Sequence, residues 1–393
     1  MKILIVSSYV PYPLTSGGYI RLYNLLKQLS QRHEITLICE KRSKQVLTSD
    51  DIKVLEKFCK KVIVIPAKKQ WSWQNIAKAG TSSLPFLLTG HTHSAMKQAI
   101  IDTLREKRFD VIHVETFYIF QNVPKTYLPI ILAEHNIEYL VYERFAKTAP
   151  AYMRPILSLD IAKMKYWEKK FWKRATKLVA VSQEDKKYMG REDVVVVPNG
   201  VDIKAFPFVK EKERKEKRVL FIGDFKWVQN MNTARWILTE IWPKISEQLP
   251  SDFPAKLWIV GKHIPDSLRS LNANGIIFDE NAPKETAKIF ARADVLLSPI
   301  TVGGGTSYKI LEAMATGCPV VTTQLGVKGL GARHDIHALV GETTSDLAKH
   351  VETLLLQKRV AEKIRSNARK LIEEHFTWET IAKTLEGVYR SAL

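Results

Sequence analysis

The chain has 393 residues, of which 45% are hydrophobic and 9% aromatic, and 60 Lys and Arg against 41 Asp and Glu give a formal net charge of +19 at pH 7. This length exceeds the size at which a single hydrophobic core stops growing, so two domains are expected, and the hydrophobic content excludes a disordered chain. The three cysteines are odd in number and far apart, which excludes a disulfide framework or a zinc motif and favours a reducing compartment.

The charge and hydropathy pattern bounds the partners. No apolar run approaches the ~20 residues that span a bilayer, and the first run, which ends at Val6, is too short for the core of a signal peptide. A surface this basic favours an anionic partner. Nucleic acid is disfavoured because no helix-turn-helix, zinc-finger, RNP or KH signature is present. We therefore expect a cytoplasmic protein that meets a membrane surface or phosphorylated substrates.

Short apolar runs alternate with amphipathic helical patterns through the first half of the chain. Continuous Val, Ile and Leu runs of this kind predict parallel strands that are buried on both faces, as in a doubly wound domain. The predicted strands are 3–6, 35–39, 62–65, 111–114, 130–133, 178–181 and 194–197.

A glycine pair follows the first predicted strand. A loop from Ser7 to Ser16 leads to Gly17 and Gly18, which open a predicted helix. A dinucleotide-binding turn would need G-x-G-x-x-G directly after the strand, and this motif is missing. The long loop can instead reach a ligand, although a simple turn would also explain the two glycines.

A histidine follows the predicted strand 130–133. Ligands of parallel sheets bind outside the carboxyl ends of the strands, so the position of His135 favours a functional role over a structural one. Asn136 and Glu138 are weaker candidates from the same loop. His91 and His93 have no Glu, Asp or Cys at ligand spacing, so we predict no metal site there and expect both at the surface.

The two halves of the chain are separated by a turn. Pro198, Asn199 and Gly200 form the turn signal, and the charged run 210–218, which alternates in sign, is expected to be a solvated linker or an exposed helix end. The second half repeats the pattern of the first. Its predicted strands are 219–222, 257–260, 276–278, 295–297, 320–321 and 338–340, followed by a last helix over 378–393.

A glycine-rich loop in the second half predicts an anion site. Gly303, Gly304 and Gly305 leave backbone N–H groups uncovered before Thr306, which would cap a helix that runs to Gly317. Exposed amides and the positive end of a helix dipole suit a phosphate or a pyrophosphate.

Two charged residues of this helix suit a phosphorylated ligand as well. Lys309 and Glu312 lie one turn into the helix as i and i+3, on one side. The lysine can neutralise phosphate, and the glutamate can accept hydrogen bonds from sugar hydroxyls.

The run GGGTSYKILEAMATGCPVV at 303–321 resembles the nucleotide-sugar-binding signature of glycosyltransferase family 4, retaining enzymes with the GT-B fold. The resemblance covers nearly the whole chain, including the glycine pair, the turn at His135, VPNGVD at 197–202 and Phe221-Ile222-Gly223. It is strongest for the GGGT-x-x-K-I-L-E-A-M-A branch. It implies two Rossmann-like domains facing a cleft: an acceptor-binding domain over 1–199 and a nucleotide-sugar-binding domain over 200–376, with a helix over 377–393 packed back on the first.

The resemblance also implies roles for the site residues. The donor would be bound by Gly17, Gly18, Gly223, the loop 303–307 including Thr306 and Ser307, and by Lys309 and Glu312. The catalytic residues would be His135, which meets the donor sugar near the reacting bond, together with Lys309 and Glu312. Asn136 and Glu138 would lie on the acceptor side.

Two departures from the family pattern affect the donor. The family usually carries a second glutamate eight positions before Glu312, and Gly304 stands there instead. Asp224 stands where the family often has an arginine for the diphosphate. We therefore expect Lys309 to carry more of the phosphate contact, and the sequence leaves open the sugar, the base, the acceptor and the oligomeric state.

The expected activity is metal-independent transfer of a sugar from a nucleotide sugar to a glycan or lipid-linked acceptor, with no cofactor. Retaining transfer develops charge on the leaving phosphate, which preorganised donors stabilise, and the chain has no D-x-D pair to hold a divalent metal. The alternatives are a catalytically silent nucleotide-sugar-binding scaffold, and an epimerase or phosphorylase on the same architecture.

Two stretches place tryptophan beside lysine, at 68–73 and 163–174. This composition is typical of segments that lie on an anionic membrane surface. Aromatic residues facing the core would explain the second stretch equally well.

Overall fold

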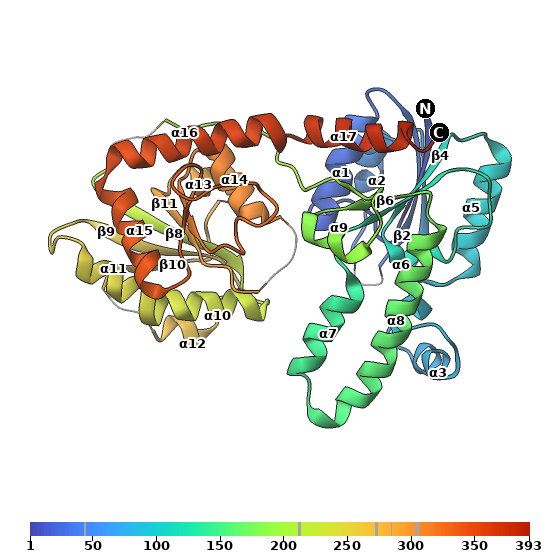
Figure 1. The fold of residues 1–393 in the computed structure, drawn as a ribbon, viewed down its shortest axis with the longest axis horizontal. Coiled ribbons are helices and arrows are strands. Elements are labelled where there is room, and N and C mark those ends of the chain that lie inside the picture. Colours follow the sequence, from blue (N-terminus) through green and yellow to red (C-terminus); the bar gives the residue numbers. More distant parts are fainter. Residues whose placement is uncertain (43–44, 211–213, 272–273, 284, 303–305) are drawn as a thin grey trace. The chain divides into compact units, whose positions relative to one another are not determined.

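The computed structural model describes residues 1–393 except 43–44, 211–213, 272–273, 284 and 303–305 (Figure 1). The chain forms two compact units: unit 1 comprises Met1–Pro198 with Ile381–Leu393, and unit 2 comprises Asn199–Thr380. Within the described residues, no helix combines the length and apolarity that crossing a membrane requires.

Unit 1 is built on a seven-stranded sheet with the order β3-β2-β1-β4-β5-β6-β7. Every neighbouring pair is parallel, and in β1 the residues from Ile3 to Val6 are all buried, so both faces of the sheet are covered. The strands are β1 (Lys2–Ser7), β2 (Glu34–Lys41), β3 (Lys61–Pro66), β4 (Val111–Glu115), β5 (Ile130–Glu134), β6 (Lys177–Ala180) and β7 (Val195–Val196).

Helices connect these strands, as parallel pairing requires. They are α1 (Gly17–Leu29), α2 (Ser49–Glu56), α3 (Trp73–Thr81), α4 (Phe86–His91), α5 (Ser94–Glu106), α6 (Phe117–Phe120), α7 (Glu138–Thr148), η1 (Ala151–Met153), α8 (Arg154–Arg174) and α9 (Gln183–Met189). The last helix, α17 (Trp378–Arg390), belongs to this unit from Ile381 onward.

Unit 2 has a six-stranded parallel sheet with the order β10-β9-β8-β11-β12-β13. Its strands are β8 (Lys217–Asp224), β9 (Ala255–Lys262), β10 (Ile276–Asp279), β11 (Val295–Ser298), β12 (Val320–Thr322) and β13 (Leu339–Val340). Its helices are α10 (Val228–Trp236), the π-helical η2 (Ile237–Ile241), α11 (Trp242–Gln248), α12 (Asp266–Arg269), α13 (Thr286–Phe290), α14 (Tyr308–Thr316), α15 (Thr344–Leu356) and α16 (Lys358–His375).

The predicted fold class, two doubly wound parallel-sheet domains, is confirmed. Each predicted apolar run coincides with a strand to within two residues at either end. Two helix boundaries are wrong. The last helix, α17, ends at Arg390 and not at Leu393. Helix α14 begins at Tyr308 with Ser307 as its N-cap residue, so Thr306 does not cap it. The Thr306 side chain is instead buried, and its hydroxyl has no hydrogen-bond partner among the described residues. The helix ends as predicted at Gly317, whose φ of 82° suits glycine.

Candidate functional site

The candidate site of unit 1 lies at the carboxyl ends of β4 and β5. His135 follows β5 directly, and its Nε2 lies 2.5 Å from Oε1 of Glu115, the last residue of β4. Since β4 and β5 are adjacent, these two side chains meet at the sheet edge where ligands of parallel sheets bind.

Glu115 is a buried carboxylate that holds two histidines at once. Its Oε2 lies 2.6 Å from Nε2 of His113, and its Oε1 lies 3.7 Å from Nε of Arg21. Burial alone would raise the pKa of Glu115, but His135 and His113 outweigh it and hold that pKa well below its ordinary value. A carboxylate that stays ionised at this position fixes the orientation of the His135 ring through Nε2.

Gly18 makes room for the other side of the His135 ring. A Cβ added at Gly18 would lie 3.3 Å from Cε1 of His135 and 3.3 Å from the hydroxyl of Tyr9. This is tighter than ordinary van der Waals contact, so a methyl group would displace the ring or the start of α1. Gly17 and Gly18 are the first two residues of α1. Gly18 therefore lets the start of this helix pack directly against the candidate catalytic histidine.

The weaker candidates share a cavity with His135. A pocket of about 140 Å³ is lined by His135, Asn136 and Glu138. The other lining residues come from the first loop and the start of α1, from the position after β2, and from α6, among them Ser16, Gly18, Tyr19, Arg42 and Tyr118. Burial raises the pKa of Glu138, although hydrogen bonds from Tyr118 and Asn136 oppose that shift. The sequence-predicted residues of the first half therefore come together in one place.

Further hydrogen bonds connect Glu115 to the last helix and to the end of β7. The Tyr389 hydroxyl lies 3.0 Å from Nδ1 of His113. Arg21 donates to the carbonyl oxygens of Val197 and Pro198, both at 2.8 Å. Glu115 was missed by sequence reasoning, although the strand-end rule that selects His135 also applies to the last residue of the neighbouring strand.

The expectation that His91 and His93 lie at the surface is wrong. Both face Glu40, a fully buried residue of β2: His93 Nε2 lies 3.0 Å from Oε1, and His91 Nδ1 makes a short hydrogen bond to Oε2. The hydrogen bonds from the two histidines outweigh burial and lower the pKa of Glu40. Within the described parts of the chain, no three His, Cys, Asp or Glu side chains group as a metal site.

The candidate site of unit 2 centres on Lys309, at the carboxyl edge of the second sheet. Its ammonium donates to the carbonyl oxygen of Ile222 at 2.8 Å and contacts Oδ1 of Asn230 at 3.4 Å. It also lies 5.1 Å from the centre of the Phe221 ring. Burial lowers the pKa of Lys309 to about 8.

Glu312 lies one turn further along α14, with a neutral partner. The Thr286 hydroxyl donates to Oε2 of Glu312 at 3.3 Å. Burial raises the pKa of Glu312 to about 7, and the Thr286 hydrogen bond only partly opposes it. The lysine and the glutamate therefore both have pKa values shifted toward neutrality, as expected for charged groups that await a ligand of opposite charge or a hydrogen-bond donor.

Asn230 connects the remaining residues of this site. It donates from Nδ2 to the carbonyl oxygen of Asp224 at 2.8 Å, and a Cβ at Gly223 would come within 2.8 Å of it. Gly223 is therefore required for the approach of α10 to β8. Asp224 Oδ1 lies 3.1 Å from Nδ1 of His263, so its carboxylate already has a hydrogen-bonding neighbour.

A pocket of about 200 Å³ opens beside Lys309 and also includes Ser307, Asn230 and Ser298 in its wall. Thr306 lies directly before Ser307, and its buried hydroxyl has no hydrogen-bond partner in the part of the chain that the structure describes. The backbone amides of Gly303, Gly304 and Gly305, which are predicted to bind phosphate, lie outside the described residues.

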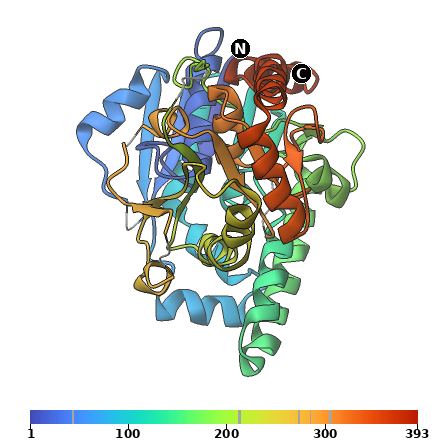
Figure 2. The same cartoon turned by 90° about the vertical axis from the view of Figure 1, so that its left-hand side faces the viewer.

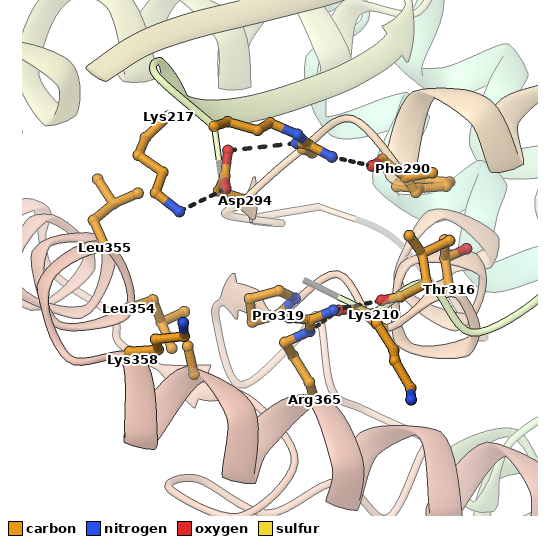
Figure 3. A pocket seen from close by; sticks show the side chains of 16 residues that line it. Lys210, Lys217, Phe290, Asp294, Thr316, Pro319, Leu354, Leu355, Lys358 and Arg365 are labelled. Carbon is orange, nitrogen blue, oxygen red and sulfur yellow. Dashed lines mark hydrogen bonds and ion pairs between the residues drawn. The ribbon is translucent and has the colours of Figure 1, made fainter. Parts of the chain in front are cut away.

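A larger cavity of unit 2, about 390 Å³, lies at the opposite, amino-terminal edge of the sheet (Figure 3). Several of its basic side chains contact other groups of the protein: Lys217 pairs with Asp294 at 3.2 Å, and Arg365 donates to the carbonyl oxygens of Gly317 and Val209. Because these groups are engaged with the protein itself, the cavity is not a candidate for the donor site.

Each half of the chain matches a family model of glycosyltransferases. The family model Glycosyltransferase Family 4 matches residues 15–205, and the family model Glycosyl transferases group 1 matches residues 216–357. The chain is 24% identical to a 44.6 kDa protein of the cps region of Klebsiella pneumoniae, over 95% of this chain and 96% of that protein.

Solved structures share the fold. Sucrose-phosphate synthase from Thermosynechococcus elongatus superposes with a TM-score of 0.71 at 16% identity, covering 100% of this chain and 98% of that one. HepE from Anabaena, solved in complex with UDP-glucose, superposes with a TM-score of 0.66 at 16% identity and covers 100% of both chains.

Proposed function

We propose that this chain, which belongs to the glycosyltransferases with the GT-B fold, moves a sugar from a nucleotide sugar to a glycan or lipid-linked acceptor with retention of configuration. The observation that carries the proposal is the pair Lys309 and Glu312. Burial shifts the pKa values of both toward neutrality at the carboxyl edge of the sheet. A nucleotide sugar offers both complements: a diphosphate for the ammonium and hydroxyl groups for the carboxylate.

In this proposal unit 2 holds the donor, with Lys309 on the diphosphate and Glu312 on ribose or sugar hydroxyls. As the bond to the sugar loosens, negative charge grows on the leaving phosphate, and a positioned ammonium stabilises that charge. Lys309 is held by Ile222 and Asn230, so little reorganisation is needed when the charge develops. Gly223, Thr306 and Ser307 would approach the same donor, beside the glycines at 303–305.

Unit 1 takes the acceptor and supplies His135, with Asn136 and Glu138 on the acceptor side and Gly17 and Gly18 beside the donor phosphate. His135 acts at the donor sugar near the reacting bond. Glu115 is a positioning residue for it, because the short hydrogen bond to Nε2 fixes which ring nitrogen is free. The acceptor oxygen then attacks from the face that the leaving phosphate vacates.

Two comparisons favour a cell-surface polysaccharide or glycoconjugate as the product and a uridine nucleotide as the first donor to test. The Klebsiella relative is described by its place in a cps region, and HepE binds UDP-glucose. We further propose that the protein works in the cytoplasm at the membrane surface, where a lipid-linked acceptor would be presented.

The experiment is a panel of UDP-, GDP- and ADP-sugars screened for donor hydrolysis and for transfer to lipid-linked acceptors, with and without excess EDTA. We expect one nucleotide class to turn over with retained anomeric configuration, at a rate that EDTA leaves unchanged. Binding without turnover would indicate a scaffold, and a rearranged sugar or a free sugar phosphate would indicate an epimerase or a phosphorylase. Turnover lost with EDTA and restored by magnesium or manganese would overturn metal independence.

A further inference from the structure

Of the two stretches that place tryptophan beside lysine, only the first exposes its tryptophan side chains. Trp71 and Trp73 are 82% and 76% exposed. In the second stretch, Phe171 and Trp172 are buried in the core of unit 1, and the indole of Trp167 donates to the carbonyl oxygen of Ser83. The core-facing explanation therefore holds for the stretch 163–174, and a docking surface must be sought elsewhere.

Helices α7 and α8 form a hairpin that extends from unit 1, with η1 at its tip (Figure 1). The tip carries large apolar side chains with little cover: Tyr152 is 80% exposed, Ile156 75% and Leu159 63%. Phe145 on α7 is exposed as well. Uncovered apolar groups gathered on one projecting element, rather than scattered singly, are a sign of an interaction surface.

The tip is held in a defined conformation. Arg154 donates from Nε to the carbonyl oxygen of Ala149 at 3.1 Å and from Nη2 to that of Lys147 at 3.3 Å. These bonds satisfy carbonyl groups at the end of α7 and the turn into α8. The exposed side chains are therefore presented by an ordered turn.

The segment that follows the exposed tryptophans packs against the same helix as the tip. Ile156 and Leu159 lie on the face of α8 that continues, one and two turns on, through Asp160 and Lys163. Asp160 accepts the Phe86 N–H at 2.8 Å, and Lys163 donates to the carbonyl oxygens at the end of α3. The segment from Trp71 to α4 thus packs along the face that ends in the apolar tip, and both views place α3 and the hairpin at one end of unit 1 (Figures 1 and 2).

Basic side chains surround these apolar groups. A groove of about 480 Å³ between α7 and α8 has Lys147, Arg154 and Lys165 in its wall, against Glu143 as the one acid. Lys68, Lys69 and Lys78 are exposed beside the tryptophans. Tryptophan and tyrosine at the boundary of a lysine-rich surface are what a bilayer with acidic headgroups selects.

We propose that the hairpin tip (Phe145, Tyr152, Ile156 and Leu159) and the tryptophan segment (Trp71, Trp73 and Ile76) form one surface that docks on an anionic lipid bilayer. A second copy of the chain fits poorly, because a symmetric contact through this surface would bring its basic groups face to face. A bilayer supplies the opposite charge and an apolar layer for the side chains.

Docking here would also explain the placement of the site. Helix α7 starts at Glu138, three residues after His135, and its 11 residues span roughly 16 Å toward the tip. A bilayer bound at the tip would therefore lie close to the acceptor-side residues. This inference deepens the membrane association proposed above, and its test is independent of catalysis.

The test is co-sedimentation of the full chain with phosphatidylglycerol vesicles and with neutral phosphatidylcholine vesicles, at low and high salt. The wild type should bind phosphatidylglycerol, bind phosphatidylcholine weakly, and lose binding as salt screens the charges. The double variants Ile156→Ser/Leu159→Ser and Trp71→Ser/Trp73→Ser should each partition at least tenfold less. Lys68→Glu/Lys69→Glu should reduce binding most at low salt, and it changes only exposed charges.

The matched control is Tyr127→Ser. Tyr127 is fully exposed in the loop before β5. The carbonyl oxygens of Val123 and Pro124 in the same loop accept hydrogen bonds from Arg174, at the end of α8 opposite the tip. Tyr127 therefore lies away from the proposed docking surface. This variant should bind vesicles like the wild type. Full binding by both double variants, or no binding by the wild type, would overturn the docking surface.

Two further measurements separate the explanations. Sedimentation of the protein alone should give one species for all variants, and a dimer that Ile156→Ser/Leu159→Ser dissolves would assign the surface to a second copy instead. Nucleotide affinity should be equal in wild type and variants. A chain that binds vesicles as expected but no nucleotide sugar would sustain the docking surface and contradict the proposed function.

Discussion

The two candidate sites differ in how their charges are compensated. In unit 1, Glu115 is ionised and already paired with His113 and His135, so its pKa is held low by groups of the protein itself. In unit 2, Lys309 and Glu312 have only neutral partners among the residues that the structure describes, and burial moves their pKa values toward neutrality. The charge of Glu115 is therefore compensated within unit 1, whereas in our proposal a ligand compensates the charges of Lys309 and Glu312.

From this difference we infer different tasks for the two sites. A complete network fixes the orientation of a reacting side chain, which favours turnover. An incomplete one gains most from a ligand that supplies the missing charge, which favours binding. Substitutions in unit 1 should therefore act mainly on turnover, and substitutions in unit 2 mainly on affinity.

The largest effect is expected for His135→Ala. Loss of a positioned group at the reacting bond should lower turnover by roughly 10²- to 10⁴-fold while donor affinity stays near the wild-type value. The measurement is initial rates over a range of donor concentrations, with His375→Ala, an exposed histidine of α16, as the control. A variant that keeps wild-type turnover would remove His135 from the mechanism.

Glu115→Gln tests how the histidine is positioned. The amide keeps a hydrogen-bonding group next to His135 and His113 but removes the charge that both rings face. Turnover should fall by about tenfold to a hundredfold at unchanged donor affinity. A fall in donor affinity with no change in turnover would contradict the positioning role.

Substitutions in unit 2 should change the affinity for the nucleotide-sugar donor. Lys309→Ala and Glu312→Ala each remove a charge-assisted hydrogen bond to the donor and should weaken binding by about 1.5 to 3 kcal/mol, or roughly tenfold to a hundredfold. Calorimetry checks this against Lys370→Ala and Glu374→Ala, a matched exposed pair on α16. Wild-type affinity in both unit 2 variants would move the donor elsewhere.

A smaller effect concerns the stability of the ligand-free protein. The pKa of Glu312 is raised from 4.5 to about 7 on folding, so the stabilisation that comes from its protonated form is complete below pH 4.5 and is lost as the pH rises through 7. Glu312→Gln keeps an acceptor for Thr286 and should remove this loss.

The free energy of unfolding, measured in denaturant at pH 4.5 and 7.5, should therefore fall less in Glu312→Gln than in the wild type, by about 1 to 3 kcal/mol. The control Glu374→Gln should follow the wild type. An identical pH dependence in Glu312→Gln and wild type would show that this carboxylate is not strained by burial.

Local signals in the sequence predicted the fold better than they predicted the site. Buried parallel strands leave continuous apolar runs, so each strand could be found without its partners. The Thr306 cap was wrong because Ser307 is an equally good cap residue one position later, and only the packing decides between them. His91 and His93 were misplaced because their partner Glu40 lies about fifty residues away in sequence, on β2.

Glu115 and Asn230 illustrate the same limit within the site. His135 and Lys309 stand in recognisable motifs, but Glu115 acts on His135 from the neighbouring strand. Asn230 reaches Lys309 from a helix that follows another strand. Neither contact leaves a spacing signal, because each depends on which strands become neighbours in the sheet.

A bound diphosphate should raise the pKa of Lys309, so that its side chain takes up a proton from the solvent when the nucleotide binds. The most direct measurement is titration calorimetry of nucleotide binding at pH 8.5 in two buffers of different ionisation enthalpy, using the nucleotide that the donor screen selects. Since the pKa of Lys309 is about 8 in the free protein, binding should take up roughly half a proton or more per nucleotide. This uptake should vanish in Lys309→Met. Binding by the wild type without proton uptake, or equal uptake by Lys309→Met, would contradict the account.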